Sequence, residues 1–153
     1  MLALILSTYI ILSTYLAVGQ YQDVIVEAAT EDVPASLIAA VIYVESEGYE
    51  WAISPVGAVG LMQVLPYEYD PVMFATRPTA AELYDKRTNL RWGVLILEWH
   101  MYQCGDWLTG ALATYAGAGY RDCTPTATGH RYAERVQELQ RAYLWMDAMA
   151  VAD

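Results

Sequence analysis

The chain has 153 residues, which suits one globular domain or one domain with a short N-terminal appendage. Its formal net charge is −10, with 8 Lys and Arg residues against 18 Asp and Glu residues. Nucleic-acid binding needs a basic surface that displaces counterions, so this charge argues against a DNA- or RNA-binding protein. Capture of a sugar polymer would instead depend on shape, hydrogen bonds and the flat rings of the 13 Tyr and 5 Trp residues.

The N-terminal segment is apolar. Residues 1–22 contain no charged side chain, and the nearly continuous apolar run of residues 1–18 lies between a signal-peptide core and a membrane-spanning helix in length. Small residues at Ala17 and Gly19 favour cleavage after Gly19, whereas the lack of Lys or Arg before the run is untypical of a signal peptide. Three interpretations stay open: a cleaved signal peptide, a retained membrane anchor, or a helix packed on the domain. In the first two, residues 1–19 export a domain of residues 20–153.

The pattern of the first part of that domain is helical. Residues 20–30 have apolar positions at helical spacing, which predicts a first helix. A second helix is expected to begin at Pro34, after Asp32, and to end before Gly48. The apolar face of this second helix also carries one acid, since its members follow offsets of 0, 3, 4 and 7: Ile38, Val41, Ile42 and Glu45.

The rest of the chain is predicted to be mostly helical as well. Pro55 and Gly57 prevent a regular helix over residues 49–58. Pro66 ends the apolar segment of residues 60–65. A long helix is expected to place Leu90, Val94, Leu97 and Met101 inward. In chain order we expect a loop or short hairpin over residues 49–58, a short helix over 60–65, irregular surface over 67–80, and helices over 83–104, 107–115 and 131–149.

The two cysteines, Cys104 and Cys123, enclose about 18 residues. An even cysteine count in an exported chain favours a disulfide, which would contribute about 3 kcal/mol over a loop of this size. Two buried free thiols are the alternative. A metal site is not expected, because these cysteines and the distant His100 and His130 lack the spacing of metal ligands. No cofactor is implied.

A carboxyl group on the inward face of a helix suggests acid chemistry. Burial disfavours the charged form of Glu45, so its pKa should rise and it should remain protonated near neutral pH. A general acid that donates a proton to a glycosidic oxygen needs this property. The alternative is a buried glutamate bonded to backbone groups. Neither Glu47, on another side of the helix, nor Glu50, in the following loop, is an obvious second acid.

The residues that follow Glu45 carry a family resemblance. Glu45-Ser46 and then SPVGAVGLMQVLP (54–66) resemble the signature of the soluble lytic transglycosylases, a branch of the lysozyme-like superfamily. Three later segments resemble family segments in the same order: DKRTNLRWG (85–93), ALATY (111–115) and GHRYAERV (129–136). The resemblance covers about residues 20–143. It implies a mainly α, lysozyme-like domain with a cleft.

The resemblance also implies roles for individual residues. Glu45 would be the general acid and afterwards the base, and Ser54 would hydrogen-bond near the sugar's N-acetyl group or the acid. Tyr115 would position Glu45 or the reacting sugar, and Tyr132 would support the cleft. The backbone at Gly57 and Gly60 would pass close to the glycan, and Met62 and Gln63 would line the cleft. Asn89 and Gly93 would have structural roles. One departure is Ala116, which stands where the family usually has Asn.

The implied activity is cleavage of the β-1,4 bond between N-acetylmuramic acid and N-acetylglucosamine in peptidoglycan, with closure of a 1,6-anhydro ring. Two alternatives stay open: a lysozyme-type hydrolase on the same glycan strands, and a catalytically silent wall-binding or virion structural module. The expected location is the periplasm, the cell envelope or a virion, in secreted or membrane-anchored form. Expected partners are the glycan strands, a membrane contacted by residues 1–18, and a secretion-system or virion complex.

Overall fold

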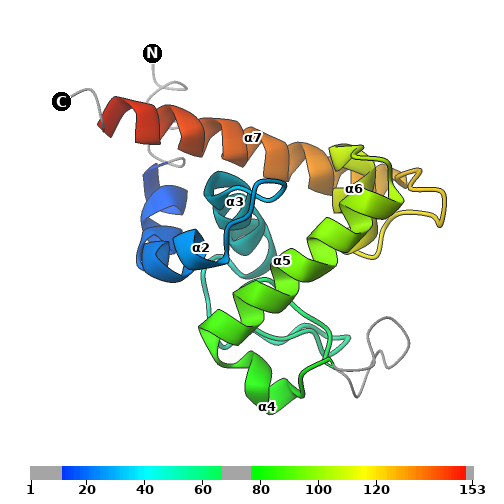
Figure 1. The fold of residues 1–153 in the computed structure, drawn as a ribbon, viewed down its shortest axis with the longest axis horizontal. Coiled ribbons are helices and arrows are strands. Elements are labelled where there is room, and N and C mark those ends of the chain that lie inside the picture. Colours follow the sequence, from blue (N-terminus) through cyan, green and yellow to red (C-terminus); the bar gives the residue numbers. More distant parts are fainter. Residues whose placement is uncertain (1–11, 67–76, 151–153) are drawn as a thin grey trace.

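A computed structural model describes residues 12–66 and 77–150, which form a mainly α fold (Figure 1). A helix over residues 12–19 comes first. The labelled helices that follow are α2 (Gln22–Ala28), α3 (Ala35–Ser46), α4 (Ala80–Leu83), α5 (Lys86–Gln103), α6 (Leu108–Tyr115) and α7 (Ala127–Ala150).

Helix α3 is the centre of the core. It packs against α2 and α7, and α7 lies across one end of the other helices (Figure 1). Ile38, Val41 and Ile42 are fully buried, which confirms the inward face expected from their spacing. The helix ends where Glu47 and Gly48 both adopt positive φ angles, of 53° and 80°. This left-handed stop fixes where the last turn of α3, which carries Glu45, meets the following loop.

The expected helix over residues 83–104 is confirmed as α5, which begins three residues later than expected, at Lys86. Asp85 is the N-cap of α5, and its side chain accepts a hydrogen bond from the amide of Thr88. Thr79 and Glu82 form a reciprocal capping box at the start of α4. The short helix α4 spans the boundary between the segment predicted to be irregular and the predicted helix, and its capping box defines it. The final helix, α7, begins at Ala127, one turn earlier than expected.

The expected short helix over residues 60–65 is wrong. This segment is a tight turn, in which Val59 forms antiparallel bridges with Ile53 and Val64. Its backbone requires positive φ angles at Gly60 and Gln63, of 80° and 49°. Residues 53–64 thus have the character of the short hairpin that was expected for residues 49–58.

Asn89 of α5 holds this turn in place. Its side-chain oxygen accepts from the Met62 amide at 2.9 Å, and its nitrogen donates to the carbonyls of Val59 and Leu83 at 2.8 and 3.0 Å. A Cβ atom on Gly60 would lie 2.2 Å from the Asn89 side-chain nitrogen. The structural reading of Asn89 is therefore confirmed, and Gly60 is required for the same packing.

The described part of the apolar N-terminal segment packs on the domain. Thr14 and Val18 are buried, and Tyr15 meets the ring of Tyr143 edge-on and donates to Asp147 of α7. In residues 12–66 and 77–150, no helix combines the length and apolar character needed to cross a bilayer. Residues 1–11, where most of the expected signal or anchor falls, lie outside the described residues, as does most of the predicted irregular segment.

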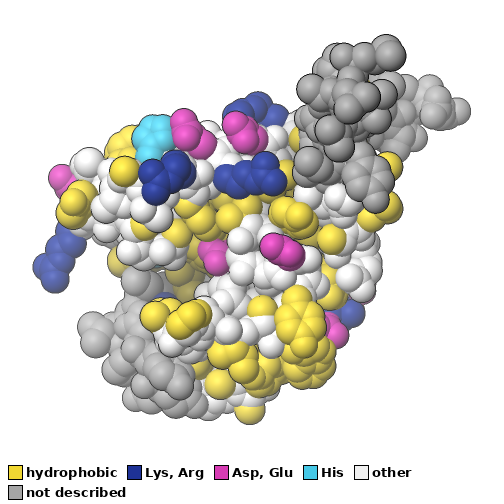
Figure 2. Space-filling view, turned by 180° about the vertical axis from the view of Figure 1, so that it is seen from behind, with side chains coloured by type: hydrophobic (Ala, Val, Ile, Leu, Met, Phe, Trp, Pro, Cys, Tyr) yellow, Lys and Arg dark blue, Asp and Glu magenta, His cyan; other side chains and the backbone are white. Residues whose placement is uncertain are grey.

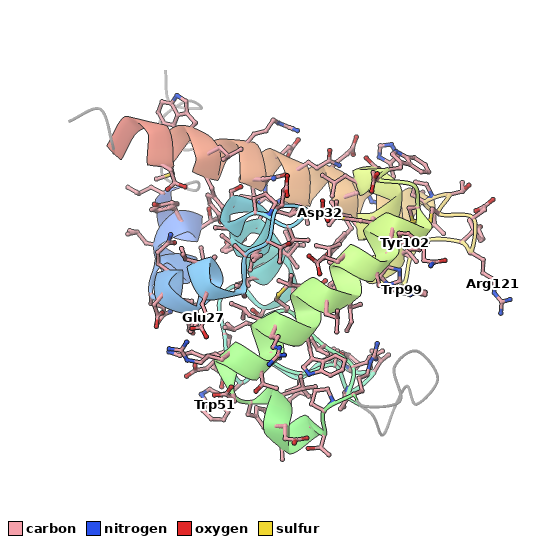
Figure 3. All side chains as sticks on the ribbon, in the orientation of Figure 1. Glu27, Asp32, Trp51, Trp99, Tyr102 and Arg121 are labelled. Carbon is pink, nitrogen blue, oxygen red and sulfur yellow. A yellow bond between two sulfur atoms is a disulfide. The ribbon has the colours of Figure 1, made fainter. Side chains whose placement is uncertain are left out.

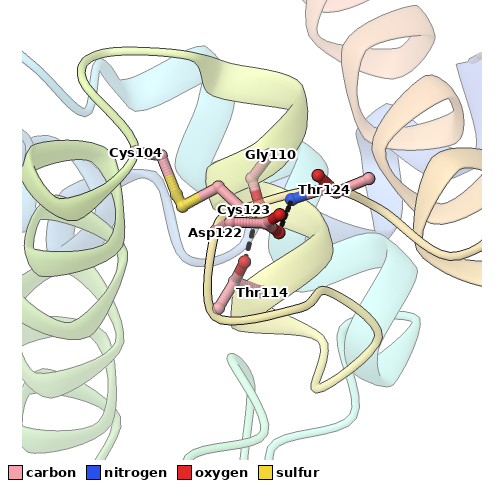
Figure 4. Close-up of a disulfide and its surroundings, with 6 residues drawn as sticks. All are labelled: Cys104, Gly110, Thr114, Asp122, Cys123 and Thr124. Atoms are coloured by element: carbon pink, nitrogen blue, oxygen red, sulfur yellow. Dashed lines mark hydrogen bonds between the residues drawn. A yellow bond between two sulfur atoms is a disulfide. The ribbon is translucent and has the colours of Figure 1, made fainter.

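The predicted disulfide between Cys104 and Cys123 is present, with 5.6 Å between the two Cα atoms (Figure 4). It joins the end of α5 to the loop that follows α6. Gly110 of α6 lies under this loop, where an added Cβ would come within 2.7 Å of the Cys123 carbonyl. The disulfide and this close contact fix the loop between α6 and α7, which borders Tyr115.

Candidate active site

Glu45 is on the last turn of α3, where its side chain is partly exposed. Its Oε1 atom accepts a hydrogen bond of 2.6 Å from the hydroxyl of Tyr132 on α7. The packing of α3 against α7 brings these residues together. The acid is thus held at a helix end by a phenol from a different helix.

Burial raises the pKa of Glu45 from its usual value near 4.5 to about 7, and the hydrogen bond from Tyr132 opposes this rise. The direction agrees with the sequence argument for a desolvated acid. A carboxyl group with a pKa near neutrality is populated in both protonation states at neutral pH. It can therefore donate a proton and later accept one without a large free-energy cost.

Tyr115, at the end of α6, contacts the turn beside the acid. Its hydroxyl donates to the carbonyl of Met62 at 2.7 Å, so Tyr132 and not Tyr115 is the hydrogen-bond partner of Glu45. Burial, followed by the charge of Glu45, raises the pKa of Tyr115 well above its usual value. Tyr115 consequently stays a neutral donor and ties α6 to the turn beside the acid.

The turn between Ser54 and Gln63 is held by its own side chains. Ser54 accepts from the Ala58 amide at 3.0 Å, and Gln63 donates to the carbonyls of Ala52 and Gly60 at 3.2 and 3.0 Å. The buried Ser46 hydroxyl lies 2.9 Å from the Leu61 carbonyl, which it can reach as a donor. Ser46 therefore attaches the turn to α3 one residue after Glu45.

Two residues expected at the glycan surface are in the interior. Met62 is fully buried against Gly93, where an added Cβ would lie 2.5 Å from the methionine sulfur. The side-chain space at Gly60 is filled by Asn89, so this glycine serves internal packing. The tight turn directs Met62 inward while Gln63 stays partly exposed. Met62 and Gly60 therefore support the turn from below, and Gln63 remains available at the surface.

A cavity of about 240 Å³ opens beside this turn. Its lining includes Tyr115 and Gln63, together with two buried residues that the sequence did not single out as site residues, Arg77 and His100. His100 follows Ile96 by four residues and Leu97 by three, a spacing that could have placed it on the inward face of α5. Figure 2 shows the rear face of the molecule hollowed between its upper and lower parts, with apolar and acidic side chains around the hollow.

The large aromatic side chains on the surface do not line this cavity, although the ring of Trp99 packs on that of His100 with 5.0 Å between centroids. Trp51 packs on Tyr84 with 5.3 Å between ring centroids, near the start of α5, whereas Trp99 and Tyr102 are on its C-terminal half (Figure 3). The charge of Glu45 acts on the hydroxyl groups of Tyr115 and Tyr132. Within the described part of the chain, no three His, Cys, Asp or Glu side chains are grouped as metal ligands.

Comparison with known proteins identifies the family. The profile of the transglycosylase SLT domain matches residues 23–134. The chain therefore belongs to the transglycosylase SLT domain family, within the lysozyme-like superfamily. The membrane-bound lytic murein transglycosylase E of Buchnera aphidicola subsp. Acyrthosiphon pisum (strain APS) is 36% identical to this chain over 76 residues. That alignment covers 46% of this chain and 34% of the Buchnera protein.

Two solved structures share the fold. They are the 70 kDa soluble lytic transglycosylase from Escherichia coli, with a TM-score of 0.67, and a complex of the 70 kDa soluble lytic transglycosylase with bulgecin A, with a TM-score of 0.69. Each is 24% identical to this chain, covers 82% of it and is itself covered over 24% of its length. The chain thus has the fold of one part of a larger protein.

Proposed function

We propose that the protein is a peptidoglycan lytic transglycosylase that cleaves the β-1,4 bond between N-acetylmuramic acid and N-acetylglucosamine. The observation that carries the proposal is Glu45, which has a pKa of about 7 and a hydrogen bond from Tyr132. Membership of the transglycosylase SLT domain family supports the same substrate class. The Buchnera relative, named as a murein transglycosylase, supports it as well.

In the first step, protonated Glu45 donates its proton to the glycosidic oxygen. The bond between this oxygen and the anomeric carbon of the muramic residue then breaks, and the leaving sugar departs with a free hydroxyl. The developing cation needs electron density from a neighbouring group. The N-acetyl oxygen of the same muramic residue supplies it, so a second protein carboxylate is not required.

In the second step, ionised Glu45 acts as a base. It accepts the proton of the 6-hydroxyl group of the muramic residue while that oxygen bonds to the anomeric carbon. The product is a 1,6-anhydro ring, and Glu45 returns to its protonated form. No water is consumed. Because one group performs both transfers, a pKa near 7 suits it better than the usual value near 4.5.

The tyrosines position this acid. Tyr132 directs Oε1 of Glu45 and favours its ionised state, which helps the first step, in which Glu45 gives up its proton. Tyr115 fixes the carbonyl of Met62, and with it the turn that presents Gln63. Gln63 and Ser54 remain proposed contacts for the glycan, through whichever of their polar groups the internal hydrogen bonds leave accessible.

A location in the cell envelope follows from this substrate. The disulfide between Cys104 and Cys123 fits an oxidising compartment outside the cytoplasm. The Buchnera relative is named as a membrane-bound protein. The proposal therefore includes attachment to a membrane through residues 1–18, or recruitment by a secretion-system or virion complex.

Mass spectrometry of the products tests the reaction. Purified glycan strands incubated with the protein should give fragments that end in 1,6-anhydro-N-acetylmuramic acid. Hydrolysis would instead give reducing ends that are heavier by one water molecule. Fragments with predominantly reducing ends would replace the transglycosylase with a lysozyme-type hydrolase. Intact strands would favour a wall-binding module.

A further inference from the structure

A second cavity, of about 650 Å³, lies between α2 and α5. It shares no lining residue with the cavity beside Tyr115, so it is separate from the candidate active site. Figure 3 shows Glu27, one of its lining residues, on α2 beside the N-terminal half of α5. The volume of this α2–α5 cavity is typical of pockets that hold a ligand as large as a short peptide.

Part of the lining of the α2–α5 cavity is apolar. Val24 and Val94 are buried, whereas Leu95 is 41% exposed and Ala28 is partly exposed. Small apolar groups of a ligand cover such a concave surface favourably, because the contact removes it from water. The cavity can therefore hold side chains of the size of alanine.

The rest of the lining includes charges of both signs. It contains two arginines and two glutamates, so the formal charge of the lining is zero. Arg87 is already compensated, because it forms an ion pair with Glu27 and another, at 3.8 Å, with Asp23. A lining of zero net charge suits a ligand that carries both signs of charge, and not a polyanion.

Two charges of the lining have no ion-pair partner. In residues 12–66 and 77–150, no carboxylate lies within 4.0 Å of the Arg91 guanidinium, and no basic group lies within 4.0 Å of the Glu98 carboxylate. The Thr30 hydroxyl donates to Oε1 of Glu98 at 2.6 Å and fixes this acid at the cavity. Arg91 and Glu98 are seven residues apart, so they face the same side of α5 with about 10 Å between them along its axis. About three residues of an extended peptide span this distance.

We propose that the α2–α5 cavity binds the stem peptide of peptidoglycan, with a peptide carboxylate at Arg91 and a peptide ammonium at Glu98. This inference rests on the proposed function, because the glycan strands carry these peptides, and it adds a second attachment point for the substrate. Stem peptides combine small alanine side chains, a glutamate carboxylate and a diamino acid with a free ammonium. These groups match the apolar wall, the unpaired cation and the unpaired anion of the cavity.

Titration with a blocked tripeptide tests the site without turnover. The probe is N-acetyl-L-alanyl-γ-D-glutamyl-L-lysinamide, which has one carboxylate and one ammonium. Nuclear magnetic resonance of the isotope-labelled wild-type protein should show saturable amide shifts in α2 and the first half of α5. Amidation of the carboxylate and acetylation of the ammonium should each weaken binding roughly three- to fivefold, as expected for the loss of an exposed ion pair.

Two variants assign each charge of the probe to its partner. Arg91→Gln should bind the probe and its amidated form equally, and should still discriminate against the acetylated form. Glu98→Gln should show the converse pattern, and its glutamine can still accept the hydrogen bond from Thr30. The controls Arg121→Gln and Glu47→Gln change the net charge equally at exposed positions outside the cavity, so they should keep both preferences. A general effect of net charge would instead appear in the controls as well.

An ordinary peptide is the alternative ligand. N-acetyl-L-alanyl-L-glutamyl-L-lysinamide carries the same charges, but adjacent side chains of an extended chain point to opposite faces, so the two charges do not reach α5 together. It should therefore bind more weakly than the γ-linked probe. Equal binding of the two peptides would assign the cavity to a protein segment and overturn the proposal.

The peptide site and the proposed reaction can fail separately. If the wild type cuts no glycan strand but binds the probe through both charges, the proposed reaction fails and the peptide site stands. The peptide site is refuted if strands are cut but the probe does not bind, or if the shifts fall outside α2 and α5. It is also refuted if Arg91→Gln and Glu98→Gln keep both preferences.

Discussion

The hydroxyl of Tyr132 lies 2.6 Å from Oε1 of Glu45, although 87 residues separate the two in the chain. This hydrogen bond joins the end of α3 to the first turns of α7. It favours the ionised carboxylate, whereas burial of Glu45 favours the protonated one. The balance of these two effects sets the pKa of about 7 on which the proposed chemistry depends.

Replacing Tyr132 with Phe should disturb that balance in a defined direction. Loss of the hydroxyl removes the effect that lowers the pKa of Glu45, so this pKa should rise further. The alkaline limb of the pH profile of kcat/KM should then move to higher pH. Turnover near neutral pH should fall roughly 10- to 100-fold, because Glu45 becomes a weaker acid and loses the hydrogen bond that directs its Oε1 atom. An alkaline limb that stays in place would show that Tyr132 does not act on Glu45.

The stability of the protein should also depend on Glu45. A carboxyl group whose pKa is raised in the folded state contributes stability below its unfolded pKa, and this contribution is lost as pH rises through the folded pKa. The free energy of unfolding of the wild type should therefore fall between pH 4.5 and about 7, by roughly 2 to 3 kcal/mol. Urea titrations across this range measure it. Glu45→Gln should lack this fall, and the exposed control Glu47→Gln should retain it.

Gly60→Ala should be strongly destabilising. The new Cβ would lie 2.2 Å from the Asn89 side-chain nitrogen and 3.1 Å from the Leu83 carbonyl, at a residue whose φ is 80°. Disruption of a buried hydrogen-bond network together with backbone strain typically costs about 3 kcal/mol or more. Gly117→Ala is the control, since Gly117 has a φ of 66° and nothing within 4 Å of an added Cβ. It should cost only about 1 to 2 kcal/mol of backbone strain.

Much of the scaffold could be predicted from local sequence. Helices α2, α3 and α6 follow apolar periodicity closely, and the inward placement of Glu45 follows from the same spacing. The short helix α4 was missed because it has only four residues, too few to show apolar periodicity. Only the capping box of Thr79 and Glu82 reveals it.

The site was less accessible to prediction because its contacts are non-local. A family signature places two tyrosines near the acid, but only the packing of α7 on α3 decides that Tyr132 is the one bonded to Glu45. Met62 was expected to line the cleft, but its side chain is buried against Gly93 of α5, a contact between segments that are distant in the chain. No sequence motif marked His100 as a site residue, because it lines a cavity that several separate segments of the chain build together.

Removing the disulfide should weaken the fold near Tyr115. Replacing both Cys104 and Cys123 with Ser releases a loop closed over 19 positions and should cost about 3 kcal/mol of unfolding free energy. Denaturant titration with and without reductant measures the loss. Reductant should lower wild-type stability by a similar amount and leave the double variant unchanged. Equal stability of all forms would mean that the crosslink does not constrain the unfolded chain.

The role of Glu45 is tested most directly by comparing turnover of Glu45→Gln and Glu47→Gln on purified peptidoglycan. Glutamine keeps the size of the side chain and can still accept the Tyr132 hydrogen bond, but it cannot donate or accept the catalytic proton. Glu45→Gln should lose cleavage by roughly 100- to 10,000-fold while remaining folded, and Glu47→Gln should cleave like the wild type. Retained cleavage by folded Glu45→Gln would contradict the account.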